Sequence, residues 1–203
     1  MAQGILSGSE ILKEIREKRI EISPFDESKV NPASVDLTLG TKVLLYEDTF
    51  YCHSDPGNGA FLYPLKKGTS PLDTRKVWPT KSFEIDPNAG WTLKPGIGYL
   101  MHTNERVRTD YYVPVLDGKS SVGRAFIKVH ETAGYGDPGF DGQYTLEVTS
   151  QYEVIVYPGM PFCQIRFHTI CGDVTLYEGR YQGEKARGAV ASRTWEQQKE
   201  NLR

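Results

Sequence analysis

The first group of residues suited to chemistry is a short segment rich in small and cationic residues. It reads Gly118-Lys119-Ser120-Ser121-Val122-Gly123-Arg124. Small residues allow close approach of the backbone, while hydroxyls, backbone amides and two cations can bind phosphate oxygens. The same composition is typical of a solvated turn between strands. The segment by itself therefore leaves both interpretations open.

A second group lies on one face of an expected strand over residues 143–149. Alternation along this stretch places Gln143, Thr145, Glu147 and Thr149 on one face, opposite Tyr144, Leu146 and Val148. A carboxylate whose pKa is raised by burial can take a proton from water and return it. Glu147 is therefore a candidate general base, provided that its face of the strand lines a pocket.

Other motif matches lack the context that they need. The run Gly134-Tyr135-Gly136-Asp137-Pro138-Gly139 fits GxGxxG, but Pro138 and a strand pattern follow where a dinucleotide site requires a helix. Gly118-Lys119-Ser120 resembles the end of a P-loop, yet Val113 stands where that motif needs glycine. The sequence has no H-x-E with P-C-x-x-C, and its four histidines lack metal-ligand spacing. We predict no protein-held metal.

The elements that position these residues are mostly strands. Ser7 and Glu10 form a capping-box pattern that predicts a short helix ending near Lys18. Beyond residue 20, closely spaced prolines and glycines leave little room for further helices. Apolar or β-branched runs of strand length cover residues 42–46, 97–102, 111–116, 125–130, 143–149 and 162–169. This pattern predicts a sandwich, barrel or jelly roll.

Composition restricts the class of protein. The 203 residues include 24 Lys plus Arg and 26 Asp plus Glu, so the net charge of -2 provides no general polyanion-binding field. No stretch approaches the roughly 18 apolar residues of a membrane helix, and the first residues do not resemble a signal peptide. Three cysteines without close pairing suit a reducing compartment. We expect a cytoplasmic protein that binds neither nucleic acid nor membranes.

The chain is expected to form one β domain over residues 1–178, with a flexible basic C-terminal arm over residues 179–203. The stretch 179–193 carries Arg180, Lys185, Arg187 and Arg193 against Glu184, a net charge of 4 - 1 = +3, together with three glycines. Residues 50–75 are predicted to form a long surface insertion.

The two segments and their surroundings together resemble the signature of the dCTP deaminases. The resemblance rests on GKSSVGR at 118–124, His130-Glu131-Thr132-Ala133-Gly134, and DPGFDGQYTLE at 137–147, with weaker similarity along nearly the whole chain. It implies a mainly β, dUTPase-like distorted jelly roll (β-clip), with the short N-terminal helix and a mobile C-terminal arm. It also implies a homotrimer with nucleotide sites between subunits.

The resemblance further implies a role for each matching residue. Glu147 falls on the general base for water attacking C4 of cytosine, and Ser120 and Arg124 fall on residues beside that water and the base. Lys119 and Ser121 would hold phosphate oxygens, although arginine is more frequent at the position of Lys119. Asp137 would bind the 3′-hydroxyl of deoxyribose, Phe140 and Tyr144 would pack the sugar and base, and Ala133 would face the pyrimidine.

The arm and the cofactor are likewise implied by the resemblance. Tyr177 and Arg180 fall on positions that reach the triphosphate from another subunit, and the arm would act as a closing lid. Glu184 departs from the family pattern, because an acid stands where a phosphate-facing glutamine is usual, and Lys185-Ala186 are inserted. Mg²⁺ would bind through the triphosphate rather than to the protein.

Several functions stay open at this point. The leading hypothesis is deamination of dCTP to dUTP and ammonia, which feeds dUMP and dTTP supply. Ala133-Gly134-Tyr135 resembles bifunctional members that also cleave dUTP to dUMP and pyrophosphate. A pure dUTPase is disfavoured because such enzymes lack the counterpart of Glu147. A non-catalytic nucleotide-binding regulator is the further alternative, and inhibition by dTTP is left undecided.

Overall fold

The computed structural model describes residues 4–47, 50–55, 59–64, 73–179, 181–183 and 187–192, with backbone alone for 50–55 and 59–64. The first part of the chain forms α1 (Gly8–Arg16), β1 (Glu21–Ser23), a 3-10 helix (Glu27–Lys29), β2 (Val30–Asn31), β3 (Ser34–Thr38), β4 (Lys42–Tyr46), β5 (Phe50–Asp55), β6 (Gly59–Pro64) and β7 (Thr80–Glu84). The second part forms β8 (Trp91–Leu93), β9 (Tyr99–Arg108), β10 (Tyr112–Gly118), α2 (Ser120–Gly123), β11 (Ile127–Lys128), β12 (Asp141–Ser150), β13 (Val154–Val156) and β14 (Pro161–Thr169). The mainly β prediction with a short N-terminal helix is confirmed.

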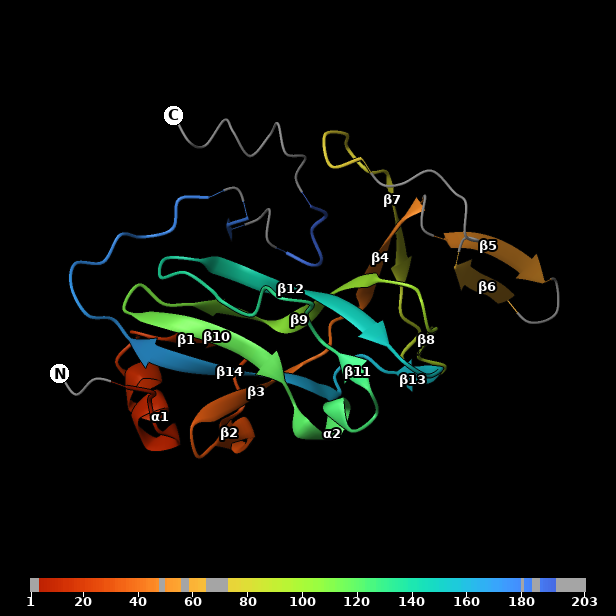
Figure 1. Ribbon diagram of the computed structural model, residues 1–203. Helices are drawn as coiled ribbons and strands as arrows, with labels where there is room; N and C mark the ends of the chain where they lie inside the picture. Colours follow the sequence, from red (N-terminus) through yellow and green to blue (C-terminus); the bar gives the residue numbers. More distant parts are fainter. Residues whose placement is uncertain are drawn as a thin grey trace.

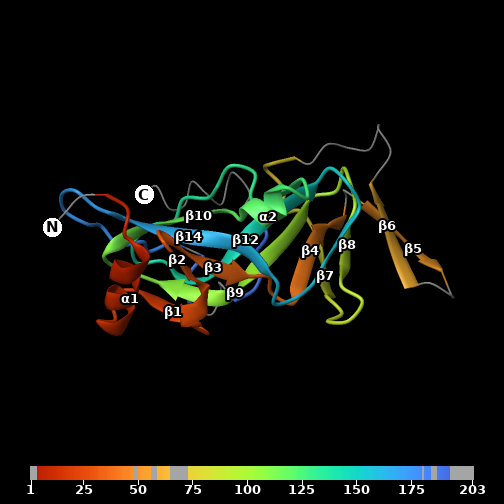
Figure 2. The ribbon, with the colours of Figure 1, turned by 90° about the horizontal axis from the view of Figure 1, so that it is seen from below.

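Two sheets build the body of the molecule (Figures 1 and 2). The larger sheet has six strands in the order β11-β12-β9-β4-β7, with β1 also paired to β9. The smaller sheet has four strands in the order β10-β14-β3-β2. Strands close in sequence, such as β10 and β12, therefore belong to different sheets. The chain crosses repeatedly between the sheets, as expected of a jelly roll.

The core lies between the apolar faces of these sheets. On β12, Leu146 and Val148 are fully buried, as are Ile165 and Phe167 on β14. Because side chains alternate along a strand, burial of Leu146 and Val148 directs Glu147 to the opposite face of β12. Core packing therefore places the predicted base outside the hydrophobic core.

Helix α1 begins as predicted and ends earlier. The Ser7 hydroxyl accepts a hydrogen bond from the Glu10 backbone N–H at 3.3 Å, which confirms half of the capping box. The Glu10 carboxylate accepts a hydrogen bond from Lys13 at 2.8 Å and so pairs along the helix. The helix ends at Arg16 rather than near Lys18, whose φ of 58° is incompatible with a right-handed helix.

Most predicted strands are confirmed, and one is not. Residues 42–46 coincide with β4, while β9 and β12 extend beyond the predicted limits to ten residues each. The strand predicted over 125–130 is wrong for most of its length, because only Ile127–Lys128 are extended. Phe126 has a φ of 57° and closes the turn after α2. A left-handed residue cannot continue a strand.

The predicted insertion contains a hairpin. Strands β5 and β6 pair with each other, from Phe50 opposite Pro64 to Asp55 opposite Gly59, and form a separate two-stranded sheet among the described strands. Figure 1 shows this hairpin at the edge of the molecule, beyond β7. Within the described ranges, no helix is long and apolar enough to cross a membrane.

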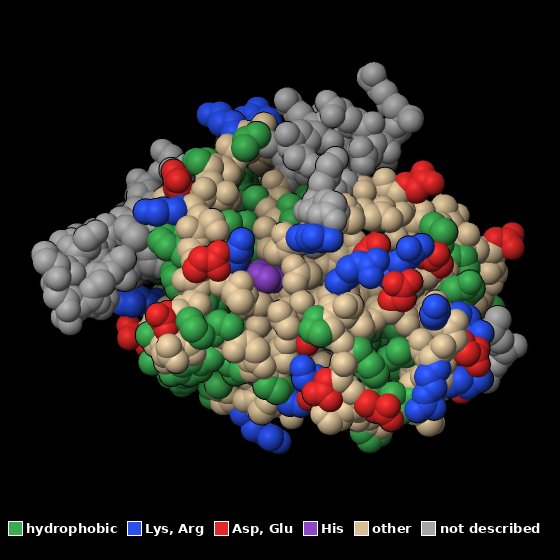
Figure 3. All heavy atoms as spheres, turned by 180° about the vertical axis from the view of Figure 1, so that it is seen from behind, with side chains coloured by type: hydrophobic (Ala, Val, Ile, Leu, Met, Phe, Trp, Pro, Cys, Tyr) green, Lys and Arg blue, Asp and Glu red, His purple; other side chains and the backbone are tan. Residues whose placement is uncertain are grey.

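Charges are distributed evenly on the face seen in Figure 3. Acidic and basic side chains are interspersed there, without an extended patch of one sign among the described residues. This distribution agrees with the small net charge of -2.

Candidate active site

A cavity of about 730 Å³ lies along the polar face of β12. Gln143, Thr145, Glu147 and Thr149 all line it, as the alternation in the sequence predicts. The register between β12 and β9 shifts between Gln143 and Thr145. At this bulge Tyr144 also lines the cavity, although simple alternation places it on the other face.

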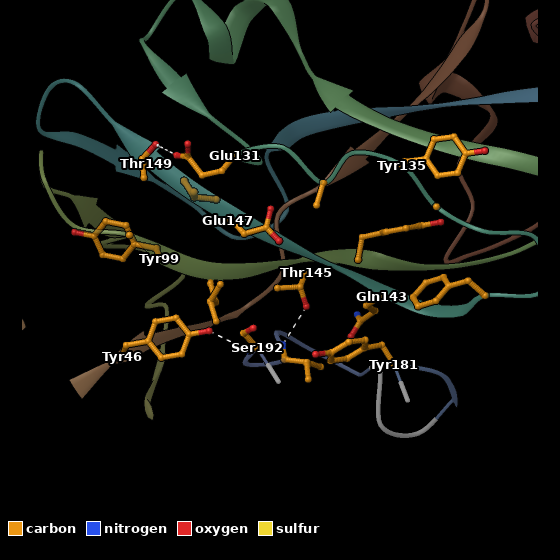
Figure 4. A pocket seen from close by; sticks show the side chains of 18 of the residues that line it. Tyr46, Tyr99, Glu131, Tyr135, Gln143, Thr145, Glu147, Thr149, Tyr181 and Ser192 are labelled. Carbon is orange, nitrogen blue, oxygen red and sulfur yellow. Dashed lines mark hydrogen bonds between the residues drawn. The ribbon is translucent and has the colours of Figure 1, made fainter. Parts of the chain in front are cut away.

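Glu147 lies at the centre of the cavity wall and is half-buried (Figure 4). Among the described residues, its Oε2 atom is shielded from solvent and has no hydrogen-bond partner. Burial raises the pKa of Glu147, and the charge of Glu131 adds to the rise, while backbone hydrogen bonds and His130 oppose it. A buried carboxylate with an unsatisfied oxygen is suited to binding and transferring a proton.

A second carboxylate, Glu131, lines the same cavity. The Thr149 hydroxyl donates to Glu131 Oε1 at 2.8 Å, and this hydrogen bond, together with the charge of Lys128, lowers the pKa of Glu131. Environment thus drives the pKa values of the two acids apart, so that Glu131 stays ionised while Glu147 can exchange a proton. Sequence reasoning assigned no role to Glu131, although it stands in the motif at 130–134.

The other side of the cavity carries residues expected to bind the nucleotide. Ala133, Asp137, Phe140, Tyr144 and Tyr177 all line the cavity, which brings five predicted substrate-binding residues together with Glu147. The rings of Phe140 and Tyr144 are 4.9 Å apart between centroids, and those of Phe140 and Tyr177 are 6.0 Å apart. This aromatic group gives the polar cavity one apolar wall, on which a flat ring or a sugar can pack.

Glycine keeps the aromatic wall in place. A Cβ atom on Gly136 would lie 2.7 Å from the Tyr144 hydroxyl oxygen and 3.0 Å from the Pro114 carbonyl oxygen. Only glycine therefore fits between these groups without a shift of the loop that carries Asp137.

The Tyr144 hydroxyl is itself buried without a hydrogen-bond partner among the described residues. Replacing Tyr144 with phenylalanine removes this unsatisfied group, so we expect stability to increase by about 1 kcal/mol and Tm by roughly 2–4 °C. Tyr112→Phe is the matched control, because the Tyr112 hydroxyl donates to buried Glu14 at 2.5 Å and its loss should lower Tm. Differential scanning calorimetry measures both. An equal fall in Tm for the two variants would show that the Tyr144 hydroxyl is bonded.

The predicted residues around α2 do not join this cavity within one chain. Lys119, Ser120, Ser121 and Arg124 are absent from its lining among the described residues, and Ser120, Ser121 and Arg124 are exposed. The Lys119 ammonium pairs with the Asp36 carboxylate on β3. Strand β10, which leads into α2, lies in the smaller sheet, whereas β12 lies in the larger one.

The described part of the C-terminal arm lies over the polar face of β12. The backbone N–H of Gly188 donates to Gln143 Oε1 at 2.6 Å, that of Val190 to Thr145 Oγ1 at 3.0 Å, and that of Ser192 to the Tyr46 hydroxyl at 2.9 Å. Figure 4 shows the last two contacts beside Glu147. Arg180 and Glu184 lie outside the described residues. Sequence reasoning did not identify Gln143, Thr145 and Tyr46 as contacts of the arm.

Comparison with known proteins identifies the family. Residues 5–170 match the family described as dCTP deaminase-like. A protein named dCTP deaminase, dUMP-forming, from Clostridium beijerinckii is 42% identical over 182 residues, which cover 89% of this chain and 92% of the relative. Proteins of the same name from Leptospira biflexa and Cytophaga hutchinsonii are 38% and 39% identical, each covering 89% of this chain and 91% and 92% of the relative.

A solved structure supports the fold. The crystal structure of 2′-deoxycytidine 5′-triphosphate deaminase from Agrobacterium tumefaciens superposes with a TM-score of 0.57 at 22% identity, covering 83% of this chain. This chain spans 49% of the length of that structure. The distorted jelly roll expected from the resemblance is thereby confirmed. Together with the family match over most of its length, this shows that the chain belongs to the dCTP deaminase-like family.

Proposed function

We propose that the protein is a dCTP deaminase of the dUMP-forming type. It would hydrolyse dCTP to dUTP and ammonia, and then hydrolyse dUTP to dUMP and pyrophosphate. The single observation that carries the first step is Glu147, a partly buried carboxylate with an unbonded oxygen at the wall of a nucleotide-sized cavity. The names of the relatives support the second step.

The chemistry of deamination assigns Glu147 its role. Glu147 takes one proton from water as the water oxygen bonds to C4, and passes it to N3. It then takes the second proton from the new C4 hydroxyl and passes it to the amine, which leaves as ammonia when the C4–N bond breaks and C4=O forms. Its surroundings favour this cycle, since burial raises the pKa of Glu147 and thus makes the carboxylate a better proton acceptor. Glu131, which stays ionised, disfavours a second negative charge nearby.

The remaining walls fit the rest of the nucleotide. Asp137 would accept a hydrogen bond from the 3′-hydroxyl, and Phe140 and Tyr144 would pack against the deoxyribose and leave no room for a 2′-hydroxyl. The Ala133 backbone would face the pyrimidine. For dUTP cleavage, we assign Asp137 the activation of a water molecule that attacks the α-phosphate.

The negative charge of the triphosphate requires cations, and we propose that some of them come from a second subunit. We infer a homotrimer in which Ser120, Ser121 and Arg124 of one subunit reach the cavity of the next, because within one chain these exposed residues do not line it. Tyr177, and Arg180 from the arm, would contact the triphosphate. Mg²⁺ would arrive on the triphosphate and balance its charge; among the described residues, no three His, Cys, Asp or Glu side chains group as metal ligands.

Product analysis tests the proposal. Purified protein is incubated with dCTP and Mg²⁺, and ammonia, uracil nucleotides and pyrophosphate are each quantified. Equal amounts of ammonia, dUMP and pyrophosphate are expected. Accumulation of dUTP without pyrophosphate would remove the second step, and absence of ammonia would remove the first. Adding dTTP to the same assay tests whether this nucleotide, which is made from the product dUMP, inhibits the enzyme.

A cytoplasmic location stays a prediction.

The pH dependence tests the environment of Glu147. Because Glu147 must be ionised to accept a proton, kcat/KM should fall as pH drops through its pKa, with a midpoint above the ordinary value of 4.5. Glu131→Gln removes a neighbouring negative charge, so the midpoint should move to lower pH. Steady-state rates from pH 4 to pH 9 measure both. An unchanged midpoint in Glu131→Gln would contradict coupling between the two acids.

A further inference from the structure

The residue before α2 is tied to a strand of the smaller sheet. The Lys119 ammonium donates to Asp36 Oδ2, and Asn31 Nδ2 donates to Asp36 Oδ1 at 2.8 Å. Asp36 is only 8% exposed, and both of its carboxylate oxygens are bonded. A nearly buried carboxylate requires such partners, because an unpaired charge there would be costly. The ammonium of Lys119 is thus already balanced by an internal anion.

The ion pair between Lys119 and Asp36 reaches across the intervening strand β14. In the smaller sheet β14 lies between β10 and β3, and Gln164 of β14 stands opposite both Asp117 and Asp36. Neighbouring strands lie about 4.8 Å apart, so Lys119 crosses roughly two such spacings from the end of β10 to β3. Beneath it, Gln164 Nε2 donates to the Gly118 carbonyl oxygen at 3.4 Å. Both contacts hold the same turn against the sheet.

Helix α2 needs such support. It is a single turn, Ser120–Gly123, in which only Val122 is buried, and the N-cap residue Lys119 makes no capping hydrogen bond with its side chain. The Lys119 carbonyl oxygen accepts the backbone N–H groups of Val122 at 3.0 Å and Gly123 at 2.9 Å. One helical turn is unstable alone, because nucleation costs more than one or two hydrogen bonds return. Its geometry must therefore come from contacts outside the helix.

We propose that Asp36 is a positioning residue, which fixes the start of α2 by holding Lys119 and thereby directs Ser120 and Arg124 toward the nucleotide. This role rests on the proposed function, in which α2 serves the cavity of a neighbouring subunit.

Exchange of the two charges tests the proposal. We expect Asp36→Asn and Lys119→Asp each to lower kcat/KM for dCTP by about 10- to 100-fold, within the range of couplings measured for directly bonded pairs. The double variant Asp36→Lys/Lys119→Asp should recover to within about 5-fold of the natural protein. Lys42→Met/Glu84→Gln, which removes an exposed lysine–glutamate pair on the other sheet, is the control and should not alter the rate. A double variant no better than Lys119→Asp would overturn the proposal.

Hydrogen exchange supplies a readout that does not depend on turnover. In Asp36→Asn, the amides of Val122 and Gly123 should lose protection by about 10-fold or more, while the amides of β9 keep theirs. Asparagine preserves the acceptor for Asn31 and the shape of the side chain, so this variant removes the charge with least disturbance. Unchanged protection in α2 would refute the proposal that Asp36 fixes the start of this helix. A protein with no activity toward dCTP but with lost protection would refute the proposed function alone.

Discussion

Replacing Glu147 with glutamine is expected to lower kcat for dCTP deamination by about 10²- to 10⁴-fold, the range that positioned general acid–base groups contribute. Glutamine has nearly the same shape but cannot accept a proton from water or pass one to the amine. The measurement is ammonia release at saturating dCTP, with dCTP affinity determined separately by calorimetry. Affinity should change little, because the amide still fills the same place in the cavity wall.

Stability provides the control for this variant. Since burial raises the pKa of Glu147 in the folded protein, ionisation of Glu147 opposes folding above that pKa. Neutral glutamine removes this penalty, so Glu147→Gln should equal or exceed the natural protein in Tm at pH 8 and show no gain below the ordinary pKa of 4.5, where the carboxyl is protonated in both the folded and the unfolded protein. A lower Tm at pH 8 would mean that the lost rate reflects damaged packing. Retention of more than a tenth of kcat would reject Glu147 as the base.

Mixing two inactive variants should restore activity. If each site combines Glu147 of one subunit with Arg124 of the next, Glu147→Gln and Arg124→Ala trimers are both nearly inactive. After the variants are unfolded and refolded together in equal amounts, random trimers have roughly a quarter of their sites with both natural residues. We therefore expect recovery of roughly a quarter of the natural rate. The large gain from nearly zero makes the result easy to measure.

The controls of the mixing experiment identify its cause. Each variant refolded alone should stay inactive, and a mixture of Glu147→Gln with Asp137→Asn should release ammonia no faster than the same amount of Asp137→Asn alone, because the proposed site takes both residues from one subunit and mixing creates no fully natural site. Analytical ultracentrifugation of the natural protein should give a mass of three chains. Failure of the first mixture to regain activity, with trimers present, would place Arg124 outside the site.

The sequence identified the polar face of β12 correctly because strand alternation is a local property. Leu146 and Val148 had to enter the core, so Glu147 and Thr149 had to leave it. Tyr144 could not be placed in the cavity by alternation, because the bulge that turns it depends on pairing with β9. Only the family resemblance suggested that Tyr144 belongs to the site.

Contacts between distant segments were beyond the reach of sequence patterns. Glu131 accepts a hydrogen bond from Thr149, eighteen positions away, and Asp36 pairs with Lys119 across β14. Nothing in the local spacing of these residues signals such pairs, because the topology of the sheets creates them. The strand predicted over 125–130 failed for a related reason: the left-handed Phe126 follows from the tight turn that closes α2.

The way in which the arm rests on β12 has a consequence for its evolution. Gln143, Thr145 and Tyr46 accept hydrogen bonds from three alternating backbone amides of the segment 187–192. Mutations that merely swap the side chains at positions 190 and 192 keep those donors, so these hydrogen bonds tolerate such changes in related enzymes. Proline is the exception, because it has no amide hydrogen, and its appearance at either position should mark a lineage whose arm is held on β12 in another way.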